Sequence, residues 1–261
     1  MAALLELRQV SKHFGGLPAV DQVDFALEQG EIVGVIGPNG AGKTTLLNCI
    51  SGLEPLTTGQ ISFKGRRIDT LKAHEIAELG IGRTFQIVKP FTGLTVKENV
   101  AVGALYGRAG RAQSVKEAMR RAQEILEQVS LAHKSSHLTS EVTIPDRKRL
   151  ELARALAMEP ELLLLDEVMA GLNPRETDDI MLLIQEINRS GKTVLIIEHV
   201  MRAIMGISHR IVVLHHGKLI ATGTPQEIAD DDRVIEAYLG ERYAAAKRAN
   251  PSAAPAANAL E

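Results

Sequence analysis

A nine-residue stretch, GPNGAGKTT at residues 37–45, constrains the fold of this chain more than any other feature. Its three glycines stand where backbone N–H groups must converge on phosphate oxygens, so that a side chain would clash or φ must be positive. Lys43 adds a positive charge for the β and γ phosphates, and Thr44 adds a hydroxyl ligand for Mg²⁺. The residues that we expect to cradle a triphosphate are Gly37, Pro38, Asn39, Gly40, Ala41, Gly42, Lys43, Thr44 and Thr45.

The residues on either side of this loop supply the context that it needs. Residues 31–36 (EIVGVI) form an apolar run that predicts a short buried strand, and residues 45–50 continue as the start of an apolar helix. The N-terminus of such a helix points unpaired amides and a positive dipole end at bound phosphate. With 261 residues, 45% of them hydrophobic, the chain can build one large α/β domain or two small ones.

The rest of the chain alternates between strand and helix patterns. Alternating apolar and polar residues at 4–10 and 23–27, continued at 61–63, predict an antiparallel sheet. Later segments follow the strand, helix, strand order of a parallel α/β sheet. They are an amphipathic helix between 112 and 131, a helix at 145–157, a buried strand at 162–165, a helix at 175–189, a strand at 193–197 and a hairpin at 211–221.

Two carboxylates, Asp166 and Glu167, follow the apolar run LLLL. The carboxyl end of a parallel strand is the edge where α/β sheets bind ligands. Asp166 suits a Mg²⁺ ligand that acts through water, and Glu167 suits a general base that polarises an attacking water. Because the phosphate loop is in the same chain, we expect the pair to serve hydrolysis of the nucleotide rather than merely to solvate the end of a strand.

Composition argues against several other classes of protein. The formal net charge is −2 and the basic residues are spread along the chain, which argues against direct binding of nucleic acid. The N-terminus lacks a basic segment followed by an apolar core, and no apolar run approaches the roughly 20 residues of a membrane helix. We therefore expect any association with a membrane to be peripheral.

Five motifs occur in an order and spacing that resemble the ATP-binding subunits of ABC transporters: GPNGAGKTT, RTFQ, LARAL before LLLLDE, AGLN, and IIEHV. The resemblance implies an ABC-type P-loop NTPase over residues 1–240. Its expected α/β fold has a mixed parallel core sheet, an antiparallel β subdomain, and an inserted helical subdomain at about 88–160. Residues 241–261 are rich in alanine and contain two prolines, and we expect them to form a disordered tail.

The resemblance also implies roles for single residues. Phe14, in KHFGG, matches an aromatic ring that stacks on adenine, and Gln86 matches a residue that touches both Mg²⁺ or its water and the membrane partner. His199 matches a switch histidine that contacts the γ-phosphate, and Asn173 matches a loop that crosses to the partner's nucleotide. The implied Mg²⁺ ligands are Thr44, Gln86 and Asp166, and the implied catalytic residues are Glu167, His199 and Gln86.

The family signature, LSGGQ or a close relative, is degenerate in this chain. The corresponding residues are Val142, Thr143, Ile144, Pro145 and Asp146. In family dimers this segment faces the γ-phosphate held by the other subunit. Pro145 has no N–H to donate there, and Asp146 places a negative charge where phosphate is expected. We therefore expect a heterodimer of two ATPase subunits with unequal sites; a homodimer with a refolded segment is the alternative.

Longer phrases, among them RTFQIVKPFTGLTVKENV and the late VIEAYLG, resemble the branched-chain amino acid uptake branch. That branch combines two ATPase subunits and two membrane permease subunits, at the cytoplasmic face of the membrane, with a periplasmic solute-binding protein. The implied cargo is a branched-chain amino acid or a related amino-acid-like or amide solute. The alternatives are the ATPase of a lipid or lipopolysaccharide exporter and a nucleotide-binding regulatory subunit with little turnover. An ABC ATPase of DNA repair or translation would carry coiled-coil insertions or tandem domains, which this sequence lacks.

Overall fold

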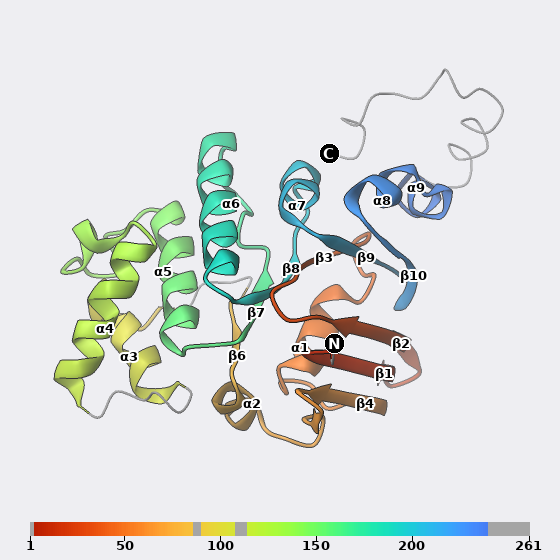
Figure 1. The fold of residues 1–261 in the computed structure, drawn as a ribbon, viewed down its shortest axis with the longest axis horizontal. Helices are drawn as coiled ribbons and strands as arrows, with labels where there is room; N and C mark the ends of the chain where they lie inside the picture. The colour runs from red at the N-terminus through yellow and green to blue at the C-terminus, as the bar shows by residue number, and fades with distance from the viewer. Residues whose placement is uncertain (1–2, 86–89, 108–113, 240–261) are drawn as a thin grey trace. The chain divides into compact units, whose positions relative to one another are not determined.

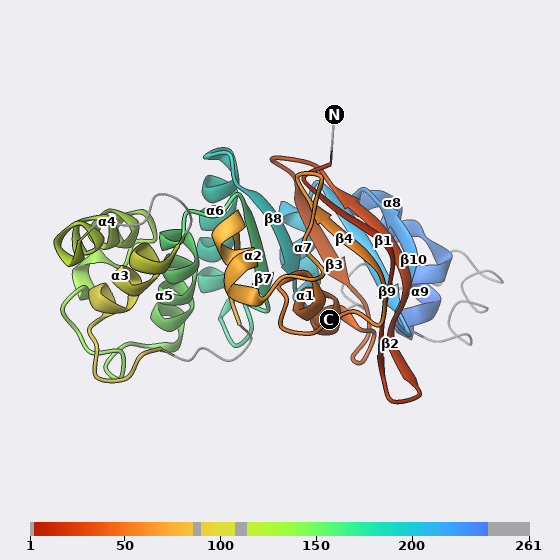
Figure 2. The ribbon, with the colours of Figure 1, turned by 90° about the horizontal axis from the view of Figure 1, so that it is seen from below.

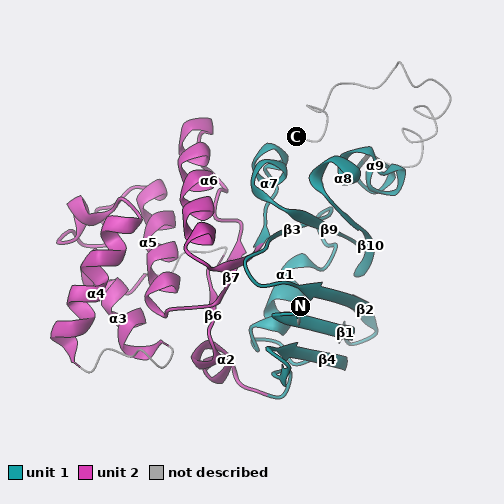
Figure 3. Ribbon diagram, viewed as in Figure 1, with its two compact units in different colours: residues 1–70, 196–261 teal, residues 71–195 magenta. Residues whose placement is uncertain are grey.

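The computed structural model describes residues 3–85, 90–107 and 114–239 (Figure 1). Gln86 and the expected tail at 241–261 lie outside the described residues. Contacts along the chain divide it into two compact units (Figure 3). Unit 1 comprises residues 1–70 and 196–261, and unit 2 comprises residues 71–195. The phosphate loop and His199 fall in unit 1, and the carboxylate pair falls in unit 2.

The order of elements alternates between strands and helices, as the patterns predict. The strands are β1 (Leu5–Phe14), β2 (Leu17–Leu27), β3 (Ile32–Ile36), β4 (Thr58–Phe63), β5 (Arg66–Arg67), β6 (Ile81–Arg83), β7 (Leu162–Asp166), β8 (Thr193–Ile197), β9 (Arg210–His215) and β10 (Lys218–Gly223). The helices are α1 (Lys43–Ile50), α2 (Ala73–Leu79), α3 (Val96–Tyr106), α4 (Val115–Gln128), the 3₁₀ turn η1 (Ala132–Lys134), α5 (Ile144–Ala157), α6 (Pro174–Arg189), α7 (Met201–Ile207), α8 (Pro225–Asp230) and α9 (Asp232–Leu239). Within the described part of the chain, no helix combines the length and apolarity needed to cross a membrane.

Unit 1 contains the predicted antiparallel sheet, in the order β2-β1-β4-β5. Figure 2 shows its strands β1, β2 and β4 in a second view. On β1, Leu5 and Leu7 are buried while Arg8 is exposed, so the alternation of the sequence becomes one buried face. Leu5 lies opposite Leu27 of β2 on one side and opposite Phe63 of β4 on the other. The prediction is confirmed, and both β1 and β2 are longer than the patterns indicate.

Unit 1 also contains the part of the core sheet that follows the phosphate-loop strand. β3 pairs in parallel with β9, and β9 pairs with β10 in an antiparallel hairpin, so this sheet is mixed. Arg210 at the start of β9 forms an ion pair with Glu31, just before β3, at 2.7 Å. Helices α8 and α9 pack beside β10. The predicted hairpin and buried strand are both confirmed.

Unit 2 combines a parallel strand pair, β6 and β7, with helices α3, α4 and α5, which pack on one another. All five residues of β7 are buried, and the first four are the apolar run LLLL that predicts a buried strand. On α4, Ala118, Ala122 and Leu126 recur every four residues and are buried, which explains why the amphipathic stretch between 112 and 131 is helical.

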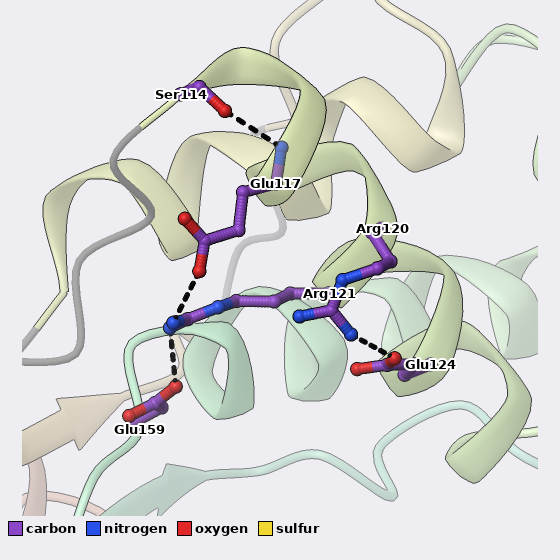
Figure 4. A network of polar contacts seen from close by, with 6 residues as sticks. All are labelled: Ser114, Glu117, Arg120, Arg121, Glu124 and Glu159. Atoms are coloured by element: carbon purple, nitrogen blue, oxygen red, sulfur yellow. Dashed lines mark hydrogen bonds and ion pairs between the residues drawn. The ribbon is translucent and has the colours of Figure 1, made fainter.

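Charged side chains on α4 form ion pairs within the helix and with the segment after α5 (Figure 4). Arg121 Nη2 lies 2.8 Å from Glu117 Oε1 one turn earlier, and its Nη1 lies 2.8 Å from Glu159 Oε1, two residues after α5. The Ser114 hydroxyl caps the helix by accepting a hydrogen bond from the Glu117 N–H at 3.2 Å. Arg121 therefore connects α4 with the segment that follows α5 within unit 2.

Candidate active site

The glycines of the phosphate loop have the backbone geometry that the motif demands. Gly37, Gly40 and Gly42 have φ of 151°, 80° and 98°. A Cβ on Gly37 would lie 2.1 Å from the carbonyl oxygen of Leu214 on β9, and a Cβ on Gly42 would lie 2.1 Å from that of Ala19 on β2. Two of the three glycines are therefore required by close packing as well as by φ, whereas nothing lies within 4 Å of a Cβ on Gly40.

Lys43 lies at the first position of α1 and its ammonium group turns back over the loop. Its Nζ donates hydrogen bonds to the carbonyl oxygens of Gly37 at 2.6 Å and Pro38 at 3.0 Å. The side chain is buried, whereas Thr44 is exposed at the start of the helix. Gly42 is the N-cap of α1, and no side chain caps this end. The first amides of α1 are thus left for a bound anion, as at other phosphate-binding helix ends.

The C-terminal helix α9 contributes a contact to the loop that the motifs do not predict. The backbone of Gly37 hydrogen-bonds the hydroxyl oxygen of Tyr238, and burial raises the pKa of Tyr238 to about 12 although this bond opposes the shift. Tyr238 lies in the VIEAYLG stretch, which the sequence singles out as a resemblance without assigning it a role. The hydroxyl helps to fix Gly37, where the chain leaves β3.

Two other expected site residues of unit 1 are solvent-accessible. Phe14, at the end of β1, is 48% exposed, and Lys12 Nζ lies 4.8 Å from the centre of its ring. His199 is exposed and follows β8 by two residues. An exposed aromatic ring has a free face on which a base can stack.

Asp166 closes β7 and is almost fully buried, at 1% exposure. Its Oδ2 lies 3.1 Å from Arg83 Nη2, and its N–H donates to the Thr84 hydroxyl at 3.1 Å. Burial raises the pKa of Asp166, and Arg83 opposes that rise. Its Oδ1 is buried with no hydrogen-bond partner. A hard, unpartnered carboxylate oxygen of this kind fits a divalent cation or one of its waters.

Glu167 adopts the left-handed backbone conformation, with φ of 52°. This conformation is unfavourable for a residue with a Cβ, and it turns the chain sharply at the end of β7. Lys148 of α5 donates from Nζ to the Glu167 carbonyl oxygen at 2.9 Å. A charged hydrogen bond therefore helps to hold this strained position.

Residues 142–146, which we expect to occupy the signature position, include the N-terminal cap of α5. The Thr143 hydroxyl donates to Asp146 Oδ2 at 2.6 Å, and the Thr143 N–H donates to the same oxygen at 3.2 Å. Lys134 Nζ also lies 2.5 Å from Asp146 Oδ2. Pro145 occupies the first turn, where its missing N–H has no helical partner to lose. Thr143 and Asp146 thus bond to each other, and Lys134 compensates the charge of Asp146.

Asn173 has a similar local role. Its side chain accepts a hydrogen bond from the Glu176 N–H at 3.0 Å, and its own N–H donates to Glu176 Oε2 at 2.9 Å. The pair forms a capping box at the start of α6. The backbone of the AGLN segment is thereby fixed where it turns into the helix.

Motif matching missed three residues that support the site: Arg83, Lys148 and Tyr238. Arg83 lies within the quoted RTFQ phrase, but nothing in the sequence indicates that it pairs with a carboxylate 83 positions later. Lys148 and Tyr238 contact backbone atoms, which leave no trace in the sequence.

Comparisons with known proteins agree with this geometry. The family model for ABC transporters matches residues 20–170, and a model for branched-chain amino acid ATP-binding cassette transporters matches residues 218–244. The high-affinity branched-chain amino acid transport ATP-binding protein LivG of Salmonella typhimurium is 44% identical, over 91% of this chain and 98% of its own. The lipopolysaccharide export system ATP-binding protein LptB of Haemophilus influenzae is 34% identical, over 92% of this chain and 99% of its own.

Solved structures match over most of the chain as well. A nucleotide-free ATP-binding cassette from an ABC transporter superposes with a TM-score of 0.84 at 30% identity, covering 92% of this chain and all of the other. A dimeric cassette in a post-hydrolysis state, bound to ADP and Pi, gives a TM-score of 0.77 at 28% identity, covering 85% of this chain and 98% of the other. The antiparallel β part and the mixed core sheet are those of this fold.

Proposed function

The chain belongs to the ABC transporter family, among the ATP-binding proteins of branched-chain amino acid transport, and we propose that it powers the uptake of these amino acids or of related small amide solutes. It is an ATPase cassette. The observation that carries the proposal is the 44% identity to a branched-chain amino acid transport protein over 91% of the chain. The chain keeps the glycine geometry of the phosphate loop and the buried carboxylate of Asp166.

Each site residue has a proposed step in ATP hydrolysis. The loop amides and Lys43 bind the β and γ phosphates, and Phe14 stacks on the adenine. Thr44, Gln86 and Asp166 are the residues that would hold Mg²⁺, and the ion would supply neutralising charge to the phosphates. Glu167 orients and polarises the attacking water, and His199 contacts the γ-phosphate. The reaction is an in-line attack of water on that phosphate, catalysed by positioning and by charge stabilisation.

The proposed assembly is a heterodimer with a second ABC ATPase, bound peripherally to two permease subunits at the cytoplasmic face of the membrane. A periplasmic solute-binding protein would deliver the cargo. The bonding of Thr143 and Asp146 supports the asymmetry, because both side chains cap their own helix. The same segment would therefore bind a partner's γ-phosphate weakly. The domain assignment that accompanies this proposal is an ATPase domain at 1–240 with its helical part at about 88–160.

Reconstitution tests the proposal directly. The chain is co-expressed with the permeases, the second ATPase and the solute-binding protein of a branched-chain amino acid transporter from the same organism, and the complex is placed in proteoliposomes. We expect leucine, isoleucine or valine, together with the binding protein, to stimulate ATP hydrolysis and to be taken up. If lipopolysaccharide alone stimulated ATP hydrolysis, the proposed amino-acid cargo would be refuted. A complex that binds ATP without hydrolysing it would indicate a regulatory subunit. Vigorous hydrolysis by the purified chain alone would favour a homodimer.

A further inference from the structure

Glu151 of α5 is a buried carboxylate to which no motif assigns a role. It is 5% exposed, and its Oε1 accepts a hydrogen bond from the Phe85 backbone N–H. Its Oε2 is also buried and has no hydrogen-bond partner. A buried carboxylate oxygen without a partner carries a desolvation cost, while an apolar side chain here would leave the Phe85 N–H without this acceptor. The Phe85 backbone is therefore the group that Glu151 holds.

The backbone that Glu151 holds directly follows two residues that contact Asp166. Two residues before Phe85, Arg83 contacts the Asp166 side chain at 3.1 Å. Thr84 is bonded twice to β7, since its N–H donates to the Leu164 carbonyl at 2.9 Å and its hydroxyl accepts from the Asp166 N–H at 3.1 Å. Phe85 is the last residue before Gln86, and its N–H points to α5 rather than to β7. The bond to Glu151 thus holds Phe85, the last described residue of this segment, against α5.

The same face of α5 holds the backbone beside the other hydrolytic residue. Lys148 lies three positions before Glu151, so the two side chains are neighbours on the helix. Lys148 Nζ donates to the carbonyl oxygen of Glu167 at 2.9 Å. One helix, whose N-terminal cap is Thr143 and Asp146, therefore contacts the chain after β6 and the chain after β7.

Charge explains why an acid suits this position. Burial raises the pKa of Glu151, while the Phe85 hydrogen bond and the nearby charges of Lys148 and Arg154 oppose the rise. A carboxylate accepts a stronger hydrogen bond from an amide than a neutral carbonyl does. A glutamine would keep the acceptor and most of the shape, whereas a leucine would keep only the bulk.

We propose that Glu151 is a positioning residue for ATP hydrolysis: it fixes the Phe85 backbone, next to the residues that contact Asp166, and with Lys148 it links this backbone and that of Glu167 to α5. The inference rests on the proposed function of Asp166 and Glu167. It predicts that Glu151 acts on turnover more than on nucleotide affinity, because Glu151 and Lys148 hold the backbone beside these two carboxylates.

The test compares Glu151→Leu with Glu151→Gln in the reconstituted complex. We expect Glu151→Leu to lower kcat about tenfold, because a small loss of alignment is costly in the reaction. The KM for ATP and the Kd of the full-length chain for a fluorescent ATP analogue should stay within about twofold of wild type. Glu151→Gln should recover kcat to within about threefold of wild type. Glu117→Leu, which removes an acid that pairs with Arg121 on α4, is the control and should leave kcat unchanged.

A second measurement tests the contact itself. The chain has five phenylalanines, so ¹⁵N-phenylalanine labelling gives five amide signals, and a Phe85→Tyr sample identifies the one from residue 85. In Glu151→Leu this signal should move upfield in the proton dimension and exchange faster with solvent, while Glu151→Gln should show a smaller change.

Three outcomes would overturn the inference. They are wild-type kcat in Glu151→Leu, a Phe85 amide that does not respond to that change, and a kcat that falls together with ATP affinity and is not recovered by Glu151→Gln. Absence of turnover in the wild-type complex would instead refute the proposed function on which the inference rests.

Discussion

The contact between Lys134 and Asp146 makes a sharp prediction about the N-terminal cap of α5. Lys134 Nζ lies 2.5 Å from Asp146 Oδ2, and the two side chains are 24% and 14% exposed. A partly buried ion pair of this kind contributes more to stability than an exposed pair and less than a fully buried charged hydrogen bond. Its removal should therefore cost about 1 to 2 kcal/mol of unfolding free energy. Lys134→Met keeps the apolar stem and removes the charge, and it should lower Tm by roughly 2 to 6 °C at pH 7.

The pH dependence of this effect follows from the carboxylate. Burial alone would raise the pKa of Asp146, but hydrogen bonds from Lys134 and Thr143 outweigh it and hold the pKa below its ordinary value. The stabilisation is therefore complete above the ordinary pKa of an aspartate and disappears as pH falls through the lowered one. Urea unfolding of Lys134→Met and wild type should differ at pH 7, and the difference should shrink as pH falls below the ordinary pKa of an aspartate. Lys116→Met, an exposed lysine of α4, is the control. Equal stability at pH 7, or a difference that does not shrink on acidification, would refute the assignment.

Three further predictions test other parts of the structure by chemical denaturation. Leu164→Ala on β7, at a fully buried site, should cost about 2 to 5 kcal/mol. Gly42→Ala should cost more than about 2 kcal/mol because its Cβ would meet the Ala19 carbonyl at 2.1 Å, whereas Gly40→Ala, with open space around it, should cost about 1 kcal/mol. Glu31→Gln should destabilise by about 1 kcal/mol at pH 7. Burial alone would raise the pKa of Glu31, but Arg210 and the Glu28 N–H hold it below its ordinary value. The difference in unfolding free energy between Glu31→Gln and wild type should therefore disappear as pH falls through this lowered pKa.

Local patterns predict the elements that carry strong periodicity. The LLLL run becomes β7, the GPNGAGKTT loop joins β3 to α1, and the residues around 211–221 form the hairpin of β9 and β10. Each of these signals lies within a few residues of the element that it specifies.

Other elements were not predicted from the sequence. Some are too short to show a periodic pattern, or pair with a strand that is distant in the sequence. β6 is only three residues long, and it pairs with a strand about 80 positions later. Helix α3 shows little periodicity in its apolar residues. Thr95 and Glu98 nevertheless form a capping box, and these residue types would have predicted the start of the helix. Helix α8 begins with the same device at Thr224 and Glu227.

The sequence predicted site residues whose role depends on residue type and on position after a strand. It could not predict contacts and backbone conformations that arise only when the chain folds. Asp166 and Glu167 could be read from their place after an apolar run. The pairing of Asp166 with Arg83 could not, nor could the left-handed backbone of Glu167. Asp146 is the clearest correction to the electrostatic reasoning, because the sequence presents an isolated negative charge and the structure places Lys134 beside it.

The most direct test of the central claim is the ATPase rate of the reconstituted complex carrying Glu167→Gln. If this chain supplies the competent carboxylate of an asymmetric pair, the rate should fall at least about 100-fold while ATP still binds, since the amide can orient the water but cannot accept its proton. The equivalent change in the partner subunit should have a much smaller effect. A complex that keeps its rate with Glu167→Gln would show that hydrolysis occurs at the other site, and it would contradict the account.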